Sequence, residues 1–266
     1  MSDFGTRGSP IARAVRRIQR ARGYPAPMDD GTAGVAGDLA PHGVLRAAIN
    51  LGNPVLAQGT SAAPAGVAVD IARAIGDRLG LAVELACFDA ARDSFAAVTT
   101  GRTDICFLAI EPARAAEVAF TAPYVLIEGV YAVSEQSPLV AVADVDRPGV
   151  RIGVNRGSAY DLFLTRTLQH ATLVRGTEGT AEFLTGNLEA AAGVREPMTE
   201  FVSSHPGFRL VEGRFMEIPQ AVGTAASKRP ETTSFLHGLV EELKAAGFVA
   251  DALRRSGQTA PVAPPA

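Results

Sequence analysis

Residues 104–124, DICFLAIEPARAAEVAFTAPY, contain the strongest candidate for binding an acidic ligand. An apolar run of strand length, Ile105 to Ile110, stops before Pro112, which lacks a backbone N–H and disfavours helix in the residue before it. Arg114 follows directly. Open α/β sheets bind ligands at the carboxyl ends of their strands, and a planar guanidinium matches a carboxylate through two parallel hydrogen bonds. We therefore expect Arg114 to bind a carboxylate, the alternative being a surface salt bridge to Glu117.

A second candidate cluster follows the apolar strand Val150 to Val154. Asn155, Gly157 and Ser158 lie between this strand and a helix. Backbone N–H groups at the start of a helix attract anions, and a serine there also serves as an ordinary N-cap. We expect all three residues to lie at the ligand site.

Two amides follow the first predicted strand, Val44 to Asn50. Asn50 ends this strand at the same sheet edge, and Asn53 lies in the loop that follows. Amide side chains both donate and accept hydrogen bonds. Both are predicted to contact ligand, with loop capping as the alternative.

Charged residues flank these strand ends, and they do not decide whether the ligand carries a positive group in addition to its carboxylate. Glu111 could receive a ligand ammonium or pair with Arg114 itself. Arg195 and Glu196 follow the predicted strand Glu189 to Gly193. A second arginine in the site would repel an ammonium and favour another anionic group.

The order of elements predicts an α/β fold. Strands at 44–50, 83–88 and 104–110 alternate with helices that begin at Val67 and after Asp89, and a second β-α-β-α-β unit covers 150–193. A long helix is predicted over 231–255. Such units form parallel sheets with right-handed crossovers.

The chain resembles the bacterial extracellular solute-binding proteins of family 3, the polar amino-acid-binding group. That signature has an aspartate, an apolar strand, Ser-x-Thr-x-x-Arg and then Phe-Ser-x-Pro-Tyr. Here the spacing from Arg114 to Phe120 is kept, followed by Thr121-Ala-Pro123-Tyr124. The segment GVAVDIARAI, residues 66–75, resembles a second family motif, and the resemblance extends over residues 44–257.

This resemblance implies a two-lobed periplasmic binding protein type II fold, each lobe a mainly parallel sheet flanked by helices, with the ligand cleft between them. Residues 42–126 plus 219–255 would form lobe 1 and 127–218 lobe 2, with a flexible basic then Gly/Pro-rich tail over 1–41 and a Pro/Ala tail over 256–266. The implied function is the solute-binding component of an ABC-type uptake transporter. Its expected partners are a small carboxylate-bearing ligand, an amino acid or organic acid, and a membrane permease, and the chain is expected to be a monomer.

The sequence departs from the family at the site. Ala109 stands in place of the signature's serine and Glu111 in place of its threonine. Val194 stands where the family has the aspartate that holds the α-ammonium, and Arg195 follows it. These departures favour acidic or dicarboxylic ligands over neutral or basic amino acids.

Composition gives no sign of other functions. The 266 residues carry a net charge of −3 and are 47% hydrophobic, so no nucleic-acid partner is indicated. No nucleotide-binding or nucleophile motif occurs, and the four histidines lack metal-ligand spacing. We expect that the protein binds no cofactor and is not an enzyme. The alternatives are a cyclohexadienyl-dehydratase-like lyase using Glu111 and a cytoplasmic ligand sensor.

The compartment is open from sequence. The family implies the periplasm, whereas residues 1–41 show no apolar core of a signal peptide, which predicts a cytoplasmic chain as written. The arginine-rich run from Ile11 to Arg22 is expected to be solvated, or else a short amphipathic helix. Cys87 and Cys106 are predicted to be buried free thiols with the first strand between them.

Overall fold

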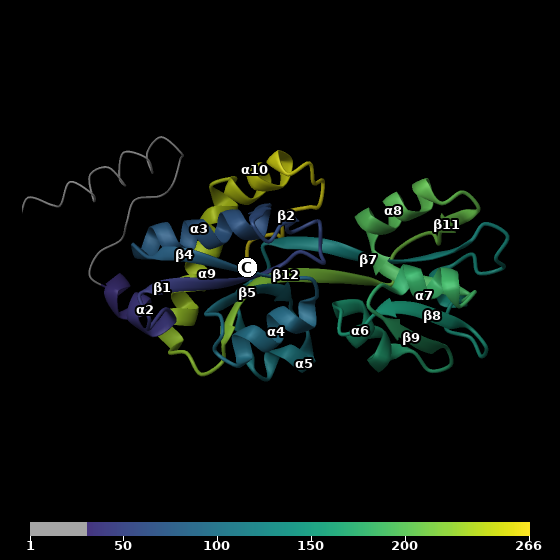
Figure 1. The fold of residues 1–266 in the computed structure, drawn as a ribbon, viewed down its shortest axis with the longest axis horizontal. Coiled ribbons are helices and arrows are strands. Elements are labelled where there is room, and N and C mark those ends of the chain that lie inside the picture. The colour runs from purple at the N-terminus through teal and green to yellow at the C-terminus, as the bar shows by residue number, and fades with distance from the viewer. Residues whose placement is uncertain (1–30) are drawn as a thin grey trace, which may run out of the picture.

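The computed structural model of the protein describes residues 31–266, and Figure 1 shows two lobes joined by two long strands. These strands are β7 (Val125–Ser134) and β12 (Met216–Ala225). They pair with each other in antiparallel register, with Ile127 opposite Ile218. The two predicted crossovers near 126–128 and 217–221 fall within this pair.

One lobe contains both ends of the described chain. Its strands are β1 (Val44–Asn50), β2 (Gln58–Thr60), β3 (Ala63–Ala65), β4 (Ala82–Phe88), β5 (Ile105–Ala109) and β6 (Val118–Phe120). Its helices are α2 (Gly31–Leu39), α3 (Val67–Leu79), α4 (Ala91–Thr99), α5 (Pro112–Ala115), α9 (Pro230–Ala245) and α10 (Phe248–Arg255).

The other lobe lies between the two long strands in the sequence. Its strands are β8 (Arg151–Asn155), β9 (Thr172–Gly176), β10 (Ala190–Val194) and β11 (Phe208–Leu210). Its helices are α6 (Ala159–Thr167), α7 (Gly179–Thr185) and α8 (Arg195–Ser204), with a short 3-10 turn at Val142–Asp144. The lobe boundaries expected from the sequence remain a prediction.

A single curled sheet runs through both lobes in the order β4-β1-β5-β12-β7-β10-β8-β9. The outer strands are parallel: β4, β1 and β5 in one lobe, and β10, β8 and β9 in the other. The long strands in the middle are antiparallel to their neighbours. The carboxyl ends of the two parallel sets therefore face each other across the junction.

Apolar periodicity explains how helices cover this sheet. In α3, Val67, Ile71 and Ile75 recur on one face, and all three are fully buried against the core. The predicted final helix is instead two helices, because Gly247 between α9 and α10 has a φ of 74°. Glycine is the residue that adopts this left-handed conformation without steric penalty.

The prediction of a flexible tail up to residue 41 is wrong for the residues that form α2. Val35 and Leu39 of this helix are buried, and Thr232 of α9 donates a hydrogen bond of 2.6 Å from its hydroxyl to Asp38. Docking against α9 thus orders a segment whose Gly/Ala-rich sequence alone favours helix weakly. The expectations for the basic run Ile11 to Arg22 and for most of the export-signal region lie outside the described residues.

The C-terminal Pro/Ala segment packs against the lobe junction rather than extending from it. Ala260 and Ala263 are buried, and Val262 forms an isolated bridge with Val125 at the start of β7. Backbone hydrogen bonds link Leu126 to Pro261 and Ala263 to Tyr124. Figure 1 shows this end of the chain near the middle of the molecule.

Two further expectations can be compared with the fold. Cys87 in β4 and Cys106 in β5 are free thiols with β1 between them, as predicted, although Cys87 is only partly buried. In the described part of the chain, no helix is both long and apolar enough to cross a membrane.

We predict that Leu39→Ala lowers the free energy of unfolding by about 2–5 kcal/mol, because it removes a fully buried side chain and leaves a cavity under α2. Urea denaturation measures this. Val140→Ala, at a residue that is 63% exposed, is the control and should change stability by less than about 0.5 kcal/mol. Equal effects of the two substitutions would show that α2 is not docked.

Candidate functional site

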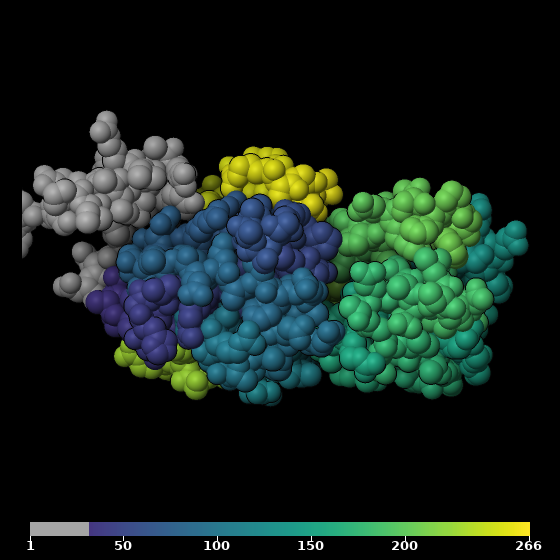
Figure 2. Space-filling model, in the orientation of Figure 1, coloured from purple at the N-terminus to yellow at the C-terminus, as the bar shows by residue number. Residues whose placement is uncertain are grey.

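A cavity of about 240 Å³ lies at the junction, lined by residues of both lobes. Figure 2 shows the boundary between the two lobes from one side. Its wall includes residues at or just after the carboxyl ends of six strands: Asn50 (β1), Asp89 (β4), Ala109 (β5), Asn155 (β8), Thr177 (β9) and Val194 (β10). This is the edge at which open α/β sheets bind ligands.

Arg114 lines this cavity from α5 and is only 3% exposed. Its Nη1 donates to the carbonyl of Ala109 (3.3 Å) within its own lobe. Its Nη2 donates to the carbonyl of Gly157 (3.0 Å) in the other lobe. The guanidinium therefore spans the seam and faces the cavity in a fixed orientation.

Burial lowers the pKa of the Arg114 guanidinium below its ordinary value, while nearby Cys106 and Glu111 oppose that shift. An arginine nevertheless stays protonated in proteins. Burial also raises the pKa of the Cys106 thiol to about 12, so that side chain stays neutral. Arg114 is thus a desolvated positive charge that a bound anion would compensate.

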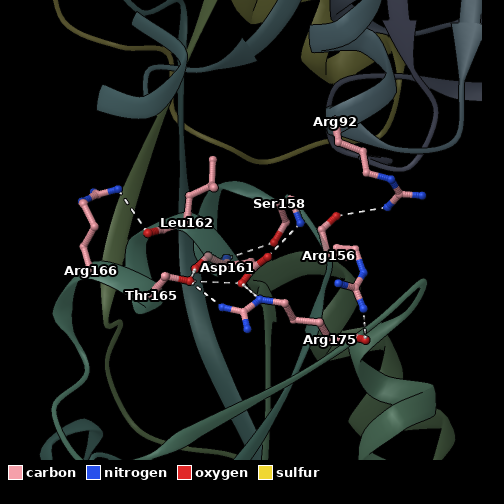
Figure 3. Close-up of polar contacts among 9 residues, drawn as sticks. Arg92, Arg156, Ser158, Asp161, Leu162, Thr165, Arg166 and Arg175 are labelled. Carbon is pink, nitrogen blue, oxygen red and sulfur yellow. Dashed lines mark hydrogen bonds and ion pairs between the residues drawn. The ribbon is translucent and has the colours of Figure 1, made fainter. Parts of the chain in front are cut away.

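The loop after β8 lies at the cavity, but its backbone donors are occupied. Gly157 N–H donates to Asp161 (2.8 Å), and Ser158 N–H donates to the Asn155 carbonyl. The Ser158 hydroxyl accepts from Asp161 N–H, which makes it the N-cap of α6. Figure 3 shows Asp161 at the centre of this network, with Arg175 bound to its other oxygen.

Of that loop, Asn155, Arg156 and Ser158 line the cavity, while Gly157 contributes its carbonyl to Arg114. Asn155 Oδ1 also accepts from Gly179 N–H at the start of α7. Gly157 has a φ of 73°, and a Cβ there would lie 3.0 Å from the Cβ of Arg92 in the opposite lobe. The lobes therefore approach each other closely at this glycine.

Asn50 and Asn53 line the cavity and also cap their loop. Asn50 Oδ1 accepts from Gly52 N–H (3.1 Å), and Asn53 Oδ1 accepts from Val55 N–H (3.3 Å). Because these bonds use only the oxygens, the amide nitrogens can donate to a ligand. Both readings of these residues are compatible with the geometry.

Glu111 takes neither of the roles expected for it. It is 3% exposed, lies outside the cavity lining, and pairs with Arg166 of α6 at 2.5 Å. A second polar contact across the seam links Arg92 to the carbonyl of Arg156 (3.1 Å; Figure 3). The side chain of Glu111 thus holds the two lobes together beside the cavity.

Arg195 and Glu196, which are predicted to face the ligand, lie outside the cavity lining. Glu196 Oε2 is buried without a hydrogen-bond partner among the described residues. Arg195 forms an ion pair with Glu128 of β7 and donates to the Gly213 carbonyl (2.7 Å). Hydrogen bonds from Arg214 and Arg195 hold the pKa of Glu128 below its ordinary value, although partial burial opposes this. Arg195 is therefore absent from the cavity wall, which contains two other arginines besides Arg114, namely Arg92 and Arg156.

Sequence reasoning missed Gln220 and an apolar wall. Gln220 lies in β12, lines the cavity and is 3% exposed. A polar residue within the otherwise apolar strand run IPQAVGT was the available signal. Apolar residues cover the side formed by β10 and α8: Ala192, Val194, Pro197, Met198 and Phe201.

Metal binding has no support in residues 31–266. That part of the chain contains no group of three or more His, Cys, Asp or Glu side chains placed to hold an ion. The donors at the cavity are guanidinium, amide and hydroxyl groups, which suit an organic anion.

Comparison with known proteins identifies the family. The model of the bacterial extracellular solute-binding proteins, family 3, matches residues 45–257. The chain belongs to this family. The members of this family are proteins that bind solutes. The chain has the same fold as substrate-binding proteins of amino-acid ABC transporters. No curated protein matches the chain.

Solved structures share the two-lobed type II periplasmic binding protein fold. A mutant of ArgBP from T. maritima is 18% identical, with a TM-score of 0.70 over 84% of this chain and 99% of that one. AbpA from Streptococcus pneumoniae, an amino acid ABC transporter substrate-binding protein bound to L-arginine, is 18% identical, with a TM-score of 0.69 over 82% and 96%. AncCDT-1, an ancestral amino-acid-binding protein described as a precursor of cyclohexadienyl dehydratase, is 18% identical, with a TM-score of 0.67 over 83% and 98%.

We predict that Arg166→Ala destabilises the protein by about 1–3 kcal/mol, because it leaves the buried Glu111 carboxylate without its charged partner. Adding Glu111→Gln should recover part of that loss, since the uncompensated charge is then gone. Denaturant unfolding of the single and double variants gives the coupling.

The matched control is Arg147→Ala, which removes an arginine from an ion pair with Asp144 on the surface. Its expected effect is below about 1 kcal/mol. An Arg166→Ala variant as stable as the Arg147→Ala variant would show that the Glu111–Arg166 pair does not hold the lobes together.

Proposed function

We propose that this protein is the recognition component of an ABC-type uptake transporter and binds a small carboxylate-bearing solute at Arg114. The observation that carries the proposal is a buried guanidinium lining a cavity between two lobes. Family membership supports solute binding, and neighbours such as AbpA are substrate-binding proteins of ABC transporters.

The physical case rests on charge and geometry at Arg114. The two carbonyls that it contacts are neutral, so they orient the guanidinium without neutralising it. Its remaining N–H groups can donate to a carboxylate in parallel pairs. An anion bound there gains a charge-assisted interaction in a desolvated setting, where such interactions are stronger than in water.

Ligand binding at this position would also favour closure of the lobes. Arg114 already bonds to the Gly157 carbonyl across the seam, so a ligand held by Arg114 lies against both lobes. Hinge closure around a ligand is a common response when a site is divided in this way. Closure within one chain fits a monomer that presents its closed form to a membrane permease.

The dehydratase alternative loses its candidate acid. That hypothesis requires Glu111 beside the ligand, whereas Glu111 is paired with Arg166 and lies outside the cavity lining. Similarity to AncCDT-1 shows the shared fold. The binding function therefore accounts for the cavity better than catalysis does.

The compartment separates an uptake function from a cytoplasmic sensor. An uptake role places the chain outside the cytoplasmic membrane, in contrast to the expectation from residues 1–41. Cell fractionation of the full chain distinguishes the two, because an exported protein is found in the periplasm or on the outer face of the membrane.

A thermal-shift screen of amino acids and small organic acids tests the proposed ligand class. A ligand present at about 100 times its Kd stabilises the native state by about 2.7 kcal/mol. Arg114→Ala should weaken binding of the acid that gives the largest shift by about 2–4 kcal/mol, measured by titration calorimetry.

Arg195→Ala is the matched control, since Arg195 lies outside the cavity wall, and it should bind the same acid with nearly unchanged affinity. Circular dichroism confirms that each variant is folded. Wild-type affinity in a folded Arg114→Ala protein would refute carboxylate binding at Arg114.

A further inference from the structure

Gln220 is a buried polar group without a partner at the wall of the cavity. The residue is 3% exposed and lines the cavity. Among residues 31–266, its side-chain amide has no hydrogen-bond partner, although neighbouring amides such as Asn50 and Asn155 do. Its side-chain nitrogen and oxygen are not among the fully enclosed polar atoms that lack a partner, so they open onto the cavity. Solvent or a bound molecule can therefore supply the hydrogen bonds of this amide.

The position of Gln220 places its amide near the guanidinium. Gln220 in β12 lies directly opposite Ala109 in β5. The carbonyl of that same Ala109 accepts from Arg114 Nη1. Paired residues of an antiparallel ladder carry their side chains on the same face, and both Gln220 and Arg114 line the cavity. If a carboxylate binds to Arg114, the carbon next to that carboxylate is expected to lie near the side-chain amide of Gln220.

The charges around the cavity disfavour an ammonium at that adjacent carbon. Three arginines, Arg92, Arg114 and Arg156, line the cavity. The acidic residues of the described lining are Asp89 and Glu178, and both are exposed to solvent. The wall contributed by β10 and α8 is apolar near Val194 and Met198. An ammonium buried beside Arg114 would need a buried counter-charge. Gln220 is neutral and offers none.

A neutral oxygen on the carbon next to the carboxylate is better suited to these surroundings than an ammonium. An amide has both a donor and an acceptor, so Gln220 can donate to a keto oxygen or exchange a hydrogen bond with a hydroxyl. Either group brings no charge that must be compensated. The apolar wall near Val194 and Met198 then suits a short hydrocarbon chain on the same molecule.

We propose that the ligand is a small organic acid with a hydroxyl or keto oxygen on the carbon next to its carboxylate, rather than an amino acid. The proposal rests on carboxylate binding at Arg114 as proposed above. Arg114 binds the carboxylate, Gln220 bonds the neutral oxygen, and the apolar wall contacts the rest of the molecule. This class differs from the L-arginine of the AbpA complex.

Matched ligand sets provide the first test. Each set has one carbon skeleton with a 2-amino, 2-hydroxy or 2-oxo group: alanine, lactate and pyruvate; leucine and its 2-hydroxy and 2-oxo analogues; phenylalanine and its analogues. Lysine and arginine are added, because a second cation could reach Asp89 or Glu178, and succinate is added because it carries a second carboxylate. In at least one set, the hydroxy or oxo acid should bind about tenfold or more tightly than the amino acid in calorimetry.

Variants of Gln220 provide the second test. Gln220→Leu should weaken the preferred hydroxy or oxo acid by about tenfold and leave the unsubstituted parent acid unchanged. Gln220→Glu supplies a carboxylate and should shift preference within the set toward the amino acid. Gln169→Leu changes an exposed glutamine outside the cavity lining and is the matched control. It should leave all affinities unchanged.

The outcomes separate this inference from the proposed function. If the amino acid binds as tightly as its analogues, or if Gln220→Leu does not discriminate between substituted and parent acids, this inference is wrong. Carboxylate binding still stands in that case, provided that Arg114→Ala abolishes binding. If no acid binds, or if Arg114→Ala binds as wild type does, the proposed function fails and this inference fails with it.

Discussion

The desolvated charge of Arg114 is the constraint on which the site depends. A guanidinium that is 3% exposed must be held by neighbours, and it is held by two carbonyls from opposite sides of the seam. The same two bonds orient it toward the cavity and bring the lobes together. The cavity wall and the contact between the lobes therefore share one side chain, and Glu111 with Arg166 adds a second link beside it.

The sheet determines where this charge can act. Strands β7 and β12 pair with each other and continue into both lobes, so the carboxyl ends of two parallel sets meet at the junction. Loops from these ends supply most of the polar wall, including Asn50 and Asn155. Gln220 differs because it comes from the middle of a crossing strand.

Local rules predicted the parts of the site that depend on local structure. Arg114, Asn50 and Asn155 were found because each follows a recognisable apolar strand, and strand ends share one edge. Arg195 was misplaced because helix α8 begins at that residue. Val194 lines the cavity, whereas the arginine after it turns to Glu128 on β7. One residue of register at a strand end decides which side chain lines the cavity.

Long-range partners could not be predicted from the sequence. Glu111 pairs with a residue on a helix in the other lobe, and nothing near Glu111 in the chain indicates Arg166. Helix α2 likewise forms because its Asp38 and Leu39 meet α9, which lies far along the sequence. Fold class and strand positions were predicted well, because they depend on periodicity that each segment carries by itself.

The C-terminal segment has a consequence for handling the protein. By bonding to the backbone of Tyr124 and Leu126, it covers the edge of β7 where the two lobes meet. An uncovered strand edge is a template for pairing with another chain. Shortening the protein here, or forcing this segment away with a bulky fusion, would expose that template beside the lobe junction. Self-association through β7, rather than simple loss of a few residues, is the expected result.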